Sequence, residues 1–307
     1  MCENCGCGHV ESFKIISMQE PPVEKTRLAE PVHEHEHEHV DANGHRYTHI
    51  HGHSHEAGEA HEHGHSHPHE AAVQTVPIHL PLLAKNDRLA ERNRGFLSAK
   101  GIFAINVVSS PGSGKTTFLA KTLELLGNDL PAAVIVGDLE TANDAARLRD
   151  KGAPVVQVTT GTVCHLDAEM VARGLEQLDL KGRRLLIIEN VGNLVCPASY
   201  DLGEAMRVVL ISVTEGEDKP LKYPPIFRGA KVVVISKTDL TAATGFDLAA
   251  VRRNIQAVAP EAVILEVSAK TGEGMQEWIA LLGKILPVSV LSPDEQATEW
   301  AKALGVY

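Results

Sequence analysis

Short apolar runs alternate with helical patterns from about Pro81 onward, whereas the preceding residues contain few apolar positions. A helix is predicted over residues 82–97, with Leu82, Leu89 and Phe96 on one stripe. Seven strand-like runs follow, with helical segments between most of them, over residues 102–109, 133–136, 155–158, 185–189, 208–214, 231–236 and 263–268. This alternation predicts an α/β fold with a doubly wound, mostly parallel sheet.

The composition changes at about residue 81 and predicts two regions. Residues 1–81 are rich in Cys and His, and too poor in apolar side chains to offset chain entropy, so we expect a flexible, disordered metal-binding region. Residues 82–307 suffice for one α/β domain. The formal net charge of −11 disfavours nucleic-acid binding, which needs Lys and Arg concentrated on one face.

The five cysteines bear on both compartment and metal binding. With no signal peptide and no apolar run of 18 or more residues, they indicate a cytoplasmic protein with reduced thiols and no membrane segment. Cys2, Cys5 and Cys7 lie too near the N-terminus for a thioredoxin-like motif, which needs a preceding strand. Together with the backbone amine of Met1 they suit square-planar Ni²⁺. Tetrahedral Zn²⁺ is the alternative.

Fourteen of the 17 histidines lie between His33 and His69, where they alternate with Glu, Gly and Ser. Neutral imidazole is the commonest protein ligand for nickel, zinc and copper, and this spacing closes several chelate rings per ion. An expression tag would be contiguous, and a solvated spacer is the other alternative. We expect this His tract to bind metal through His33, His35, His37, His39, His49, His51, His53, His55, His61, His63, His65, His67 and His69.

The strongest chemical motif is a P-loop after the first strand of the α/β region. The run SSPGSGKT over residues 109–116 leads into a helix, as the motif requires. Ser109 replaces the first glycine of the strict pattern. Backbone N–H groups of such a turn hold phosphates, the lysine neutralises the β and γ oxygens, and the hydroxyl holds Mg²⁺. The predicted nucleotide-binding residues here are Gly112, Ser113, Gly114, Lys115, Thr116 and Thr117.

Two later segments favour GTP over ATP. Asp239, in Ser-Lys-Thr-Asp after a strand, offers a carboxylate to the N1–H and 2-amino group of guanine, in a geometry where adenine offers neither hydrogen. Guanine-nucleotide proteins usually have Asn where this chain has Ser236. A backbone N–H within Ser268–Ala269–Lys270 is expected to bond guanine O6. The alternative is that Lys237 and Asp239 are surface residues that cap a strand.

Acidic residues at two strand ends are candidates for the γ-phosphate side. Asp138 is expected to hold Mg²⁺ or to orient the attacking water, and Glu189 resembles the acid that follows a Walker B strand. The Gly192 N–H is expected to bond the γ-phosphate. With Lys115, these two acids form the predicted catalytic set, although either acid alone is also explained as a polar strand end. No glutamine or arginine finger is identifiable, so intrinsic hydrolysis should be slow and switch-like.

The other two cysteines, Cys164 and Cys196, suggest a second metal site. Cys164 adjoins His165, and Cys196 lies four residues after Gly192, in a loop that would reorganise when the γ-phosphate is lost. Three such ligands leave a coordination position open, which suits an ion that is released or shared across a dimer. The alternative is that each cysteine is a buried small hydrophobe.

The ordered motifs CENCGC, SSPGSGKTT, GDLETANDA, TGTVCHLDA, ENVGNLVCP and SAKTGEG resemble the HypB family of [NiFe]-hydrogenase maturation GTPases. The likeness covers essentially the whole chain, with the His tract as a variable insert. It implies a SIMIBI-class P-loop GTPase that dimerises with nucleotide and metal. It also implies tight nickel binding at Cys2, Cys5 and Cys7, and a nickel or zinc site at Cys164, His165 and Cys196.

The resemblance further implies partners and a cellular role. These are a HypA-type nickel/zinc metallochaperone, the hydrogenase large-subunit precursor that receives nickel in a GTP-dependent step and, for some members, a SlyD-type prolyl isomerase. The His tract would store nickel. Two rivals remain: a metal-storage protein with an idle GTPase domain, and an accessory GTPase of urease assembly. The second family typically carries Cys-Pro-His and leaves CENCGC unexplained.

Overall fold

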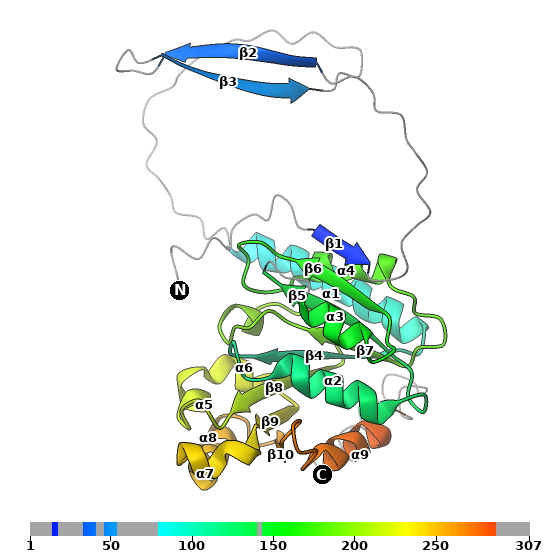
Figure 1. Ribbon diagram of the computed structural model, residues 1–307, viewed down its shortest axis with the longest axis vertical. Helices are drawn as coiled ribbons and strands as arrows, with labels where there is room; N and C mark the ends of the chain where they lie inside the picture. Colours follow the sequence, from blue (N-terminus) through cyan, green and yellow to red (C-terminus); the bar gives the residue numbers. More distant parts are fainter. Residues whose placement is uncertain (1–13, 18–32, 41–45, 54–78, 140–142, 287–307) are drawn as a thin grey trace. The chain divides into compact units, whose positions relative to one another are not determined.

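The computed structural model describes residues 14–17, 33–40, 46–53, 79–139 and 143–286 (Figure 1). The chain divides into two compact units. One comprises residues 1–19 and 77–307, and the other comprises residues 20–76. Each unit is described by itself.

The larger unit is built on an eight-stranded sheet with the order β1-β6-β5-β7-β4-β8-β9-β10. Every neighbouring pair is parallel except β1 with β6. This confirms the predicted mostly parallel sheet. The strands are β1 (Lys14–Ser17), β4 (Phe103–Ser109), β5 (Ala132–Asp138), β6 (Val155–Thr159), β7 (Leu185–Glu189), β8 (Met206–Ser212), β9 (Val232–Ser236) and β10 (Val263–Val267).

Helices cover both faces of this sheet, as a doubly wound fold requires. One hydrophobic cluster contains buried side chains of α2, α3 and α9, whereas two others contain those of α1 and α4 and of α6 and α8. The helices are α1 (His79–Ala99), α2 (Lys115–Leu126), α3 (Asn143–Arg149), α4 (Ala168–Gln177), α5 (Lys219–Lys222), α6 (Pro224–Arg228), α7 (Thr241–Thr244), α8 (Leu248–Val258) and α9 (Met275–Ile285), with 3₁₀ turns at Cys196–Ala198 and Thr238–Leu240.

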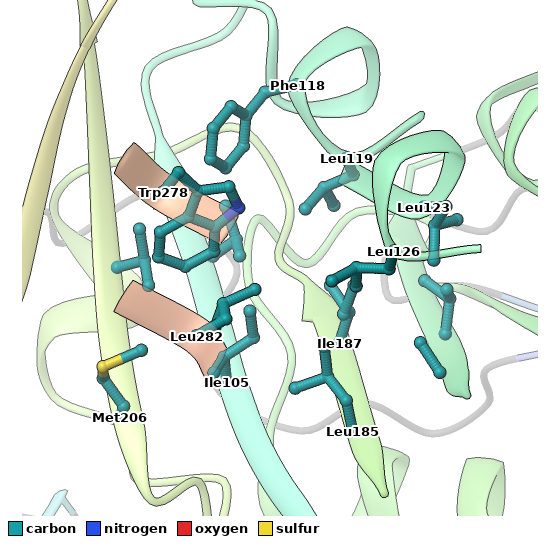
Figure 2. Packing of buried hydrophobic residues seen from close by; sticks show 14 of the residues in the cluster. Ile105, Phe118, Leu119, Leu123, Leu126, Leu185, Ile187, Met206, Trp278 and Leu282 are labelled. Atoms are coloured by element: carbon teal, nitrogen blue, oxygen red, sulfur yellow. The ribbon is translucent and has the colours of Figure 1, made fainter. Parts of the chain in front are cut away.

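Strand β4, which is apolar except for Asn106 and the terminal Ser109, supplies buried side chains to both faces of the sheet. Ile105 and Val107 join the cluster under α2 and α9, whereas Ala104 joins the cluster under α1 and α4. Successive side chains of a strand point to opposite faces, so a strand buried on both sides reads as an unbroken apolar run. Figure 2 shows the α2–α9 side, where the rings of Phe118 and Trp278 lie 5.4 Å apart between centroids.

The sheet contains one strand that the sequence analysis missed. Lys14–Ser17 lie in the region that the composition predicts to be flexible, but these residues form β1, which pairs antiparallel with β6 at the edge of the sheet. Ile15 packs partly against the core, while Ile16 is exposed. A run of four residues with two apolar side chains is too short to give a reliable periodic signal.

The smaller unit contains a two-stranded antiparallel ladder within the His tract. Strand β2 (His33–Val40) pairs with β3 (Arg46–His53), and the backbone register sets three His–His pairs opposite each other: His33 with His53, His35 with His51, and His37 with His49. The sequence analysis expected flexible chain here. A strict two-residue alternation of His and Glu has the period of a strand, so the pattern is compatible with the ladder.

The carboxyl ends of the parallel strands bring the predicted nucleotide-binding residues to one edge of the sheet. Strand β4 ends at Ser109, β5 at Asp138, β7 at Glu189 and β9 at Ser236. Open α/β sheets bind ligands in the crevice outside these carboxyl ends. The candidate nucleotide site therefore lies at this edge.

Candidate nucleotide and metal sites

The turn between β4 and α2 brings the P-loop residues together. Gly112 and Gly114 have positive φ angles of 75° and 92°, which favour glycine because a Cβ atom is strained there. Lys115 begins α2 and is buried, and its Nζ donates a 2.9 Å hydrogen bond to Ser109 Oγ. Burial lowers the pKa of Lys115. The serine that replaces the first glycine of the motif therefore supplies the lysine with an acceptor.

A buried carboxylate faces the P-loop from the end of β7. Glu189 is 3% exposed, and its Oε1 accepts a 2.7 Å hydrogen bond from the Thr116 hydroxyl. Its Oε2 has no hydrogen-bond partner among the described residues. Burial raises the pKa of Glu189 to about 7, although Lys115 and Thr116 oppose the shift. A hydroxyl beside a carboxylate oxygen without a partner is a hard-oxygen donor set that suits Mg²⁺.

Two further acids lie close enough to act on Glu189. Asp138 ends β5, which pairs with β7, and is half-buried with its Oδ1 accepting a 2.6 Å hydrogen bond from the Leu139 N–H. The charges of Asp138 and Asp144 both raise the pKa of Glu189. Asp144 lies in the first turn of α3 and was not predicted, because a lone acid at a helix start is a common capping residue.

A cavity of about 210 Å³ lies on the other side of the P-loop, between α2 and the ends of β9 and β10. Its apolar walls include Phe118, Leu240 and Val267. Seven of the predicted nucleotide-binding residues line it: Ser113, Gly114, Thr117, Lys237, Asp239, Ala269 and Lys270. The structure therefore brings together, around one cavity, residues that lie far apart in the sequence.

Within the predicted segment Ser268–Ala269–Lys270, Ser268 bonds to other protein groups. It is fully buried and does not line the cavity, and its N–H donates to Glu273 O at 2.9 Å. Its hydroxyl donates a 2.6 Å hydrogen bond to Asp239 Oδ1. Ser268 therefore positions the carboxylate, and the backbone groups left to contact a base are those of Ala269 and Lys270.

The end of β9 is tied directly to the P-loop. Ser236 is 4% exposed, and its hydroxyl donates a 2.7 Å hydrogen bond to the carbonyl of Ser113. Lys237 has a left-handed φ of 59°, and its Nζ donates to the carbonyl of Gly112 at 2.7 Å. These contacts disfavour the alternative that Lys237 merely caps a strand. Ser236 stands where guanine-nucleotide proteins usually have Asn, and its hydroxyl joins the end of β9 to the P-loop.

Glu215 is a partly buried acid that was not predicted from the sequence. Its Oε1 accepts hydrogen bonds of 3.0 Å from the Ser113 hydroxyl and from the Ser212 N–H. Its Oε2 lies 3.4 Å from Lys219 Nζ, which also donates to Ser110 Oγ at 3.3 Å. This network holds the P-loop against the loop after β8. Sequence reasoning missed it because one acid in an acidic run carries no motif.

Three side chains from two loops form a candidate metal centre. The ligand atoms of Cys164, His165 and Cys196 all lie within 4.8 Å of one another, and the two Sγ atoms are 3.2 Å apart. His165 is buried, and burial lowers its pKa to about 4, so the imidazole is neutral at pH 7, as a metal ligand must be. Two thiols and one neutral imidazole suit nickel or zinc.

The ring of Tyr200 stacks on His165, with centroids 4.0 Å apart and planes inclined by 34°. His165 Nδ1 is buried and has no hydrogen-bond partner among the described residues. Packing against Tyr200 therefore contributes to the orientation of the imidazole. The sequence analysis missed this residue because the loop has no periodic pattern that relates position 200 to position 165.

The metal centre and the P-loop are linked through one loop. Gly192 packs against Pro111 so closely that a Cβ atom at position 192 would lie 3.0 Å from the Pro111 Cα. Four residues later, Cys196 begins a 3₁₀ turn and brings its sulfur to Cys164. The loop therefore runs from contact with the phosphate-binding turn to the metal ligands.

Other predicted ligands lie outside the part of the chain whose side chains the structure describes. Cys2, Cys5 and Cys7 are outside the described residues, as are His55, His61, His63, His65, His67 and His69. For the histidines of β2 and β3 only the backbone is described. Among the described helices, none has both the length and the apolar character needed to cross a bilayer.

Comparison with known proteins identifies relatives of this chain. Residues 103–266 match the family described as "CobW/HypB/UreG, nucleotide-binding domain". The hydrogenase maturation factor HypB of Azotobacter chroococcum mcd 1 is 55% identical over 205 residues, which are 67% of this chain and 67% of that protein. The crystal structure of HypB from Helicobacter pylori in complex with nickel matches with a TM-score of 0.64 and 41% identity, over 68% of this chain and 98% of that one. HypB from Archaeoglobus fulgidus matches with a TM-score of 0.63 and 43% identity, over 66% of this chain and 99% of that one.

Proposed function

The chain belongs to the HypB family of hydrogenase maturation factors, and from this premise we propose that it hydrolyses GTP and uses the nucleotide to control when it holds and releases nickel. The observation that carries the proposal is the position of the metal centre. Cys196 lies on the same loop as Gly192, which packs on the P-loop, and its sulfur meets Cys164. A change of this loop with the nucleotide would alter the metal ligands directly.

The cavity beside the P-loop would take guanine. Asp239 would accept the N1–H and 2-amino hydrogens, which adenine does not present together, and Ser268 would hold one carboxylate oxygen. Backbone N–H groups of Ala269 or Lys270 would bond O6. The bonds from Ser236 and Lys237 to P-loop carbonyls fix the distance between base pocket and phosphate turn.

The P-loop and the acids at the neighbouring strand ends would carry out GTP hydrolysis. Lys115 would exchange its bond to Ser109 for phosphate oxygens, and the turn around Gly112 and Gly114 would supply N–H donors. Thr116 and Glu189 would hold Mg²⁺, which supplies charge neutralisation when bound. Asp138, at the next strand end, would orient the attacking water. Hydrolysis would be slow, because the sequence motifs that form the described part of this site include no arginine or glutamine finger.

Nickel would be the cargo of this cycle. The His tract would store it, the cluster of Cys2, Cys5 and Cys7 would capture it tightly, and the centre at Cys164, His165 and Cys196 would hold nickel or zinc according to nucleotide state. The centre supplies three ligands, so a fourth position remains for a second copy of this chain, for an acceptor or for water. An open position would permit a dimer with nucleotide or metal, and membership of the HypB family is the support for transfer to a HypA-type metallochaperone and to the hydrogenase large-subunit precursor.

One experiment tests the proposal against the rival of a storage protein with an idle GTPase domain. The full chain has five cysteines, so a variant with Cys2→Ser, Cys5→Ser and Cys7→Ser keeps only Cys164 and Cys196 as thiols. Nickel–thiolate charge-transfer absorption then reports only the centre at Cys164, His165 and Cys196 (the inner centre), because the histidines of the His tract give no such band. The control adds Cys164→Ser and Cys196→Ser and should lose the band.

Nickel is titrated into this variant with GDP and with a non-hydrolysable GTP analogue. We expect the two affinities to differ by about fivefold or more, which is the usual lower end of allosteric coupling. Equal affinities would favour the storage protein. Absence of the band in both states would show that Cys164 and Cys196 do not bind nickel.

A further inference from the structure

One buried asparagine touches both the nucleotide side and the metal side of the molecule. Asn190 follows Glu189 directly and is 1% exposed. Its Oδ1 accepts hydrogen bonds from the N–H of Leu166 at 3.0 Å and from the N–H of Val191 at 2.9 Å. Leu166 is the residue after His165, so a single side chain connects the end of β7 to the loop that carries two metal ligands.

The amide end of the same side chain continues into a buried relay. Asn190 Nδ2 donates to Asn106 Oδ1 at 3.3 Å, and Asn106 Nδ2 donates to Glu204 Oε1 at 3.2 Å. Glu204 Oε2 accepts from the Leu202 N–H at 2.9 Å. Leu202 lies just beyond Tyr200, which stacks on His165. The relay therefore fixes which way the Asn190 amide faces, and it ends in the second chain segment beside the metal centre.

The loop with Cys164 and His165 is held on both sides of these two residues. On the far side the Thr160 hydroxyl donates to Val163 O at 2.6 Å, and Thr160 N donates to the carbonyl of Asp138 at 2.9 Å. On the near side the hold is the bond from Leu166 to Asn190. Cys164 and His165 therefore lie between two anchored positions. Thr160 is bonded to the end of β5 at Asp138, and Leu166 is bonded to Asn190, which follows β7.

We propose that Asn190 is the positioning residue through which nucleotide state acts on the Cys164–His165 loop. This inference rests on the proposed function and names a route for it. When the carboxylate of Glu189 shifts with the Mg²⁺ that it would hold beside the γ-phosphate, Asn190 shifts with it, because the two residues are adjacent. A buried N–H is costly to leave without an acceptor, so the Leu166 backbone follows and shifts His165 relative to Cys196.

The test compares two buried asparagines. Asn190→Ala removes the acceptor of the Leu166 N–H. Asn86→Ala is the matched control, because Asn86 is 6% exposed and its side chain accepts from Ala168 N at 2.9 Å and donates to Asp201 O at 2.8 Å, so that these bonds involve neither Asn190 nor Leu166. Both are made in the variant without Cys2, Cys5 and Cys7, and nickel affinity is measured with GDP and with the GTP analogue.

We expect the parent and Asn86→Ala to keep a nucleotide ratio of about fivefold or more, and Asn190→Ala to fall within about twofold of unity. A full ratio in Asn190→Ala would overturn the inference and leave the proposed function intact. No ratio in the parent would overturn the proposed function itself, and the inference with it.

A second measurement needs no substitution and so avoids any folding defect. Amide hydrogen exchange of the unmodified chain is followed over peptides within residues 163–170, with GDP and with the GTP analogue. We expect protection of the Leu166 region to change with the nucleotide, since its acceptor moves. Exchange that is identical in the two states would overturn the inference.

Discussion

The Thr116 hydroxyl donates a 2.7 Å hydrogen bond to Glu189 Oε1 and so joins the first turn of α2 to the end of β7. The substitution Glu189→Gln keeps an oxygen acceptor for this bond and removes the negative charge. We expect GTP hydrolysis to fall by about 10²-fold or more, with smaller effects on GTP binding. Single-turnover hydrolysis and calorimetric binding measure the two quantities. A native rate would show that Glu189 is only a polar strand end.

Glu189 should also make stability depend on pH. Its pKa is about 7 in the folded chain, against 4.5 for an ordinary glutamate. The folded state therefore holds the proton more tightly, so the contribution to the free energy of unfolding is complete below pH 4.5 and is lost as pH rises to about 7. Glu189→Gln lacks this loss. The free energy of unfolding of Glu189→Gln, relative to that of the native chain, should therefore increase by up to about 3 kcal/mol as pH rises from 4.5 to about 7.

Urea unfolding of both proteins at several pH values, without nucleotide or metal, measures this difference. Groups that do not interact with Glu189 titrate equally in the two proteins and cancel. The same cancellation holds for His165, whose lowered pKa gives a loss of stability in the opposite direction, as pH falls from 6.5 to about 4. A stability difference that does not change with pH would contradict the raised pKa of Glu189.

The sheet and the P-loop were predictable because each has a strong local signal. Strand β4 is apolar except for Asn106 and the terminal Ser109, and the glycines at 112 and 114 have the positive φ angles that the turn requires. Strand β1 was not predictable, because its place depends on pairing with β6, far along the chain. Tertiary contacts decide such short edge strands.

For the site, sequence motifs identified residue types but not every role. A backbone N–H within Ser268–Ala269–Lys270 was predicted to bond the base, and within that segment the Ser268 N–H donates to Glu273 O and its hydroxyl donates to Asp239, a role that the motif did not indicate. Glu215 and Asn190 were missed entirely, because their importance lies in partners that are distant in sequence. Hydrogen bonds between separate loops leave no periodic pattern from which they could be read.

The substitution Asp239→Asn tests the guanine pocket. The carboxylate would accept two guanine hydrogens, and an amide there would place a donor against one of them. We expect GTP affinity to fall by about 100-fold and xanthosine triphosphate to bind better than GTP, because its 2-oxo group accepts from the amide. Competition binding with GTP, ATP and xanthosine triphosphate measures the preference.

The matched control for this prediction is Ser268→Ala, which removes the 2.6 Å bond to Asp239 but keeps the carboxylate. Ser268→Ala should lower GTP affinity by about tenfold without changing the order in which GTP, ATP and xanthosine triphosphate are preferred. An unchanged preference for GTP in Asp239→Asn would mean that the cavity beside the P-loop does not select the base.

Deletion of residues 33–69 tests the division of labour in the N-terminal region. These residues lie within the unit of residues 20–76, so their removal takes out the β2–β3 ladder but leaves every strand of the eight-stranded sheet, including β1. We expect the number of nickel ions bound to fall while the tightest affinity is kept, because that affinity is assigned to Cys2, Cys5 and Cys7. Equilibrium dialysis and chelator competition measure the two properties. Loss of the tightest site would make the His tract the primary ligand.

Tyr200 should set the nickel affinity of the inner centre through His165. The two rings lie 4.0 Å apart, and Nδ1 of the imidazole has no hydrogen-bond partner among the described residues, so packing is the main restraint on the ring that the structure shows. Groups that orient a metal-binding histidine typically contribute tenfold or more to affinity. We therefore expect Tyr200→Ala to lower the nickel affinity of this centre by about tenfold.

The variant Tyr200→Phe separates ring packing from the hydroxyl. It keeps the aromatic face, and neither substitution removes the backbone carbonyl of Tyr200 that accepts from Arg207 at 3.3 Å. Nickel affinity should therefore stay within about twofold of native in Tyr200→Phe, read from the thiolate band in the variant without Cys2, Cys5 and Cys7. Equal weakening in both variants would assign the effect to the hydroxyl, and native affinity in Tyr200→Ala would show that His165 is oriented without the ring.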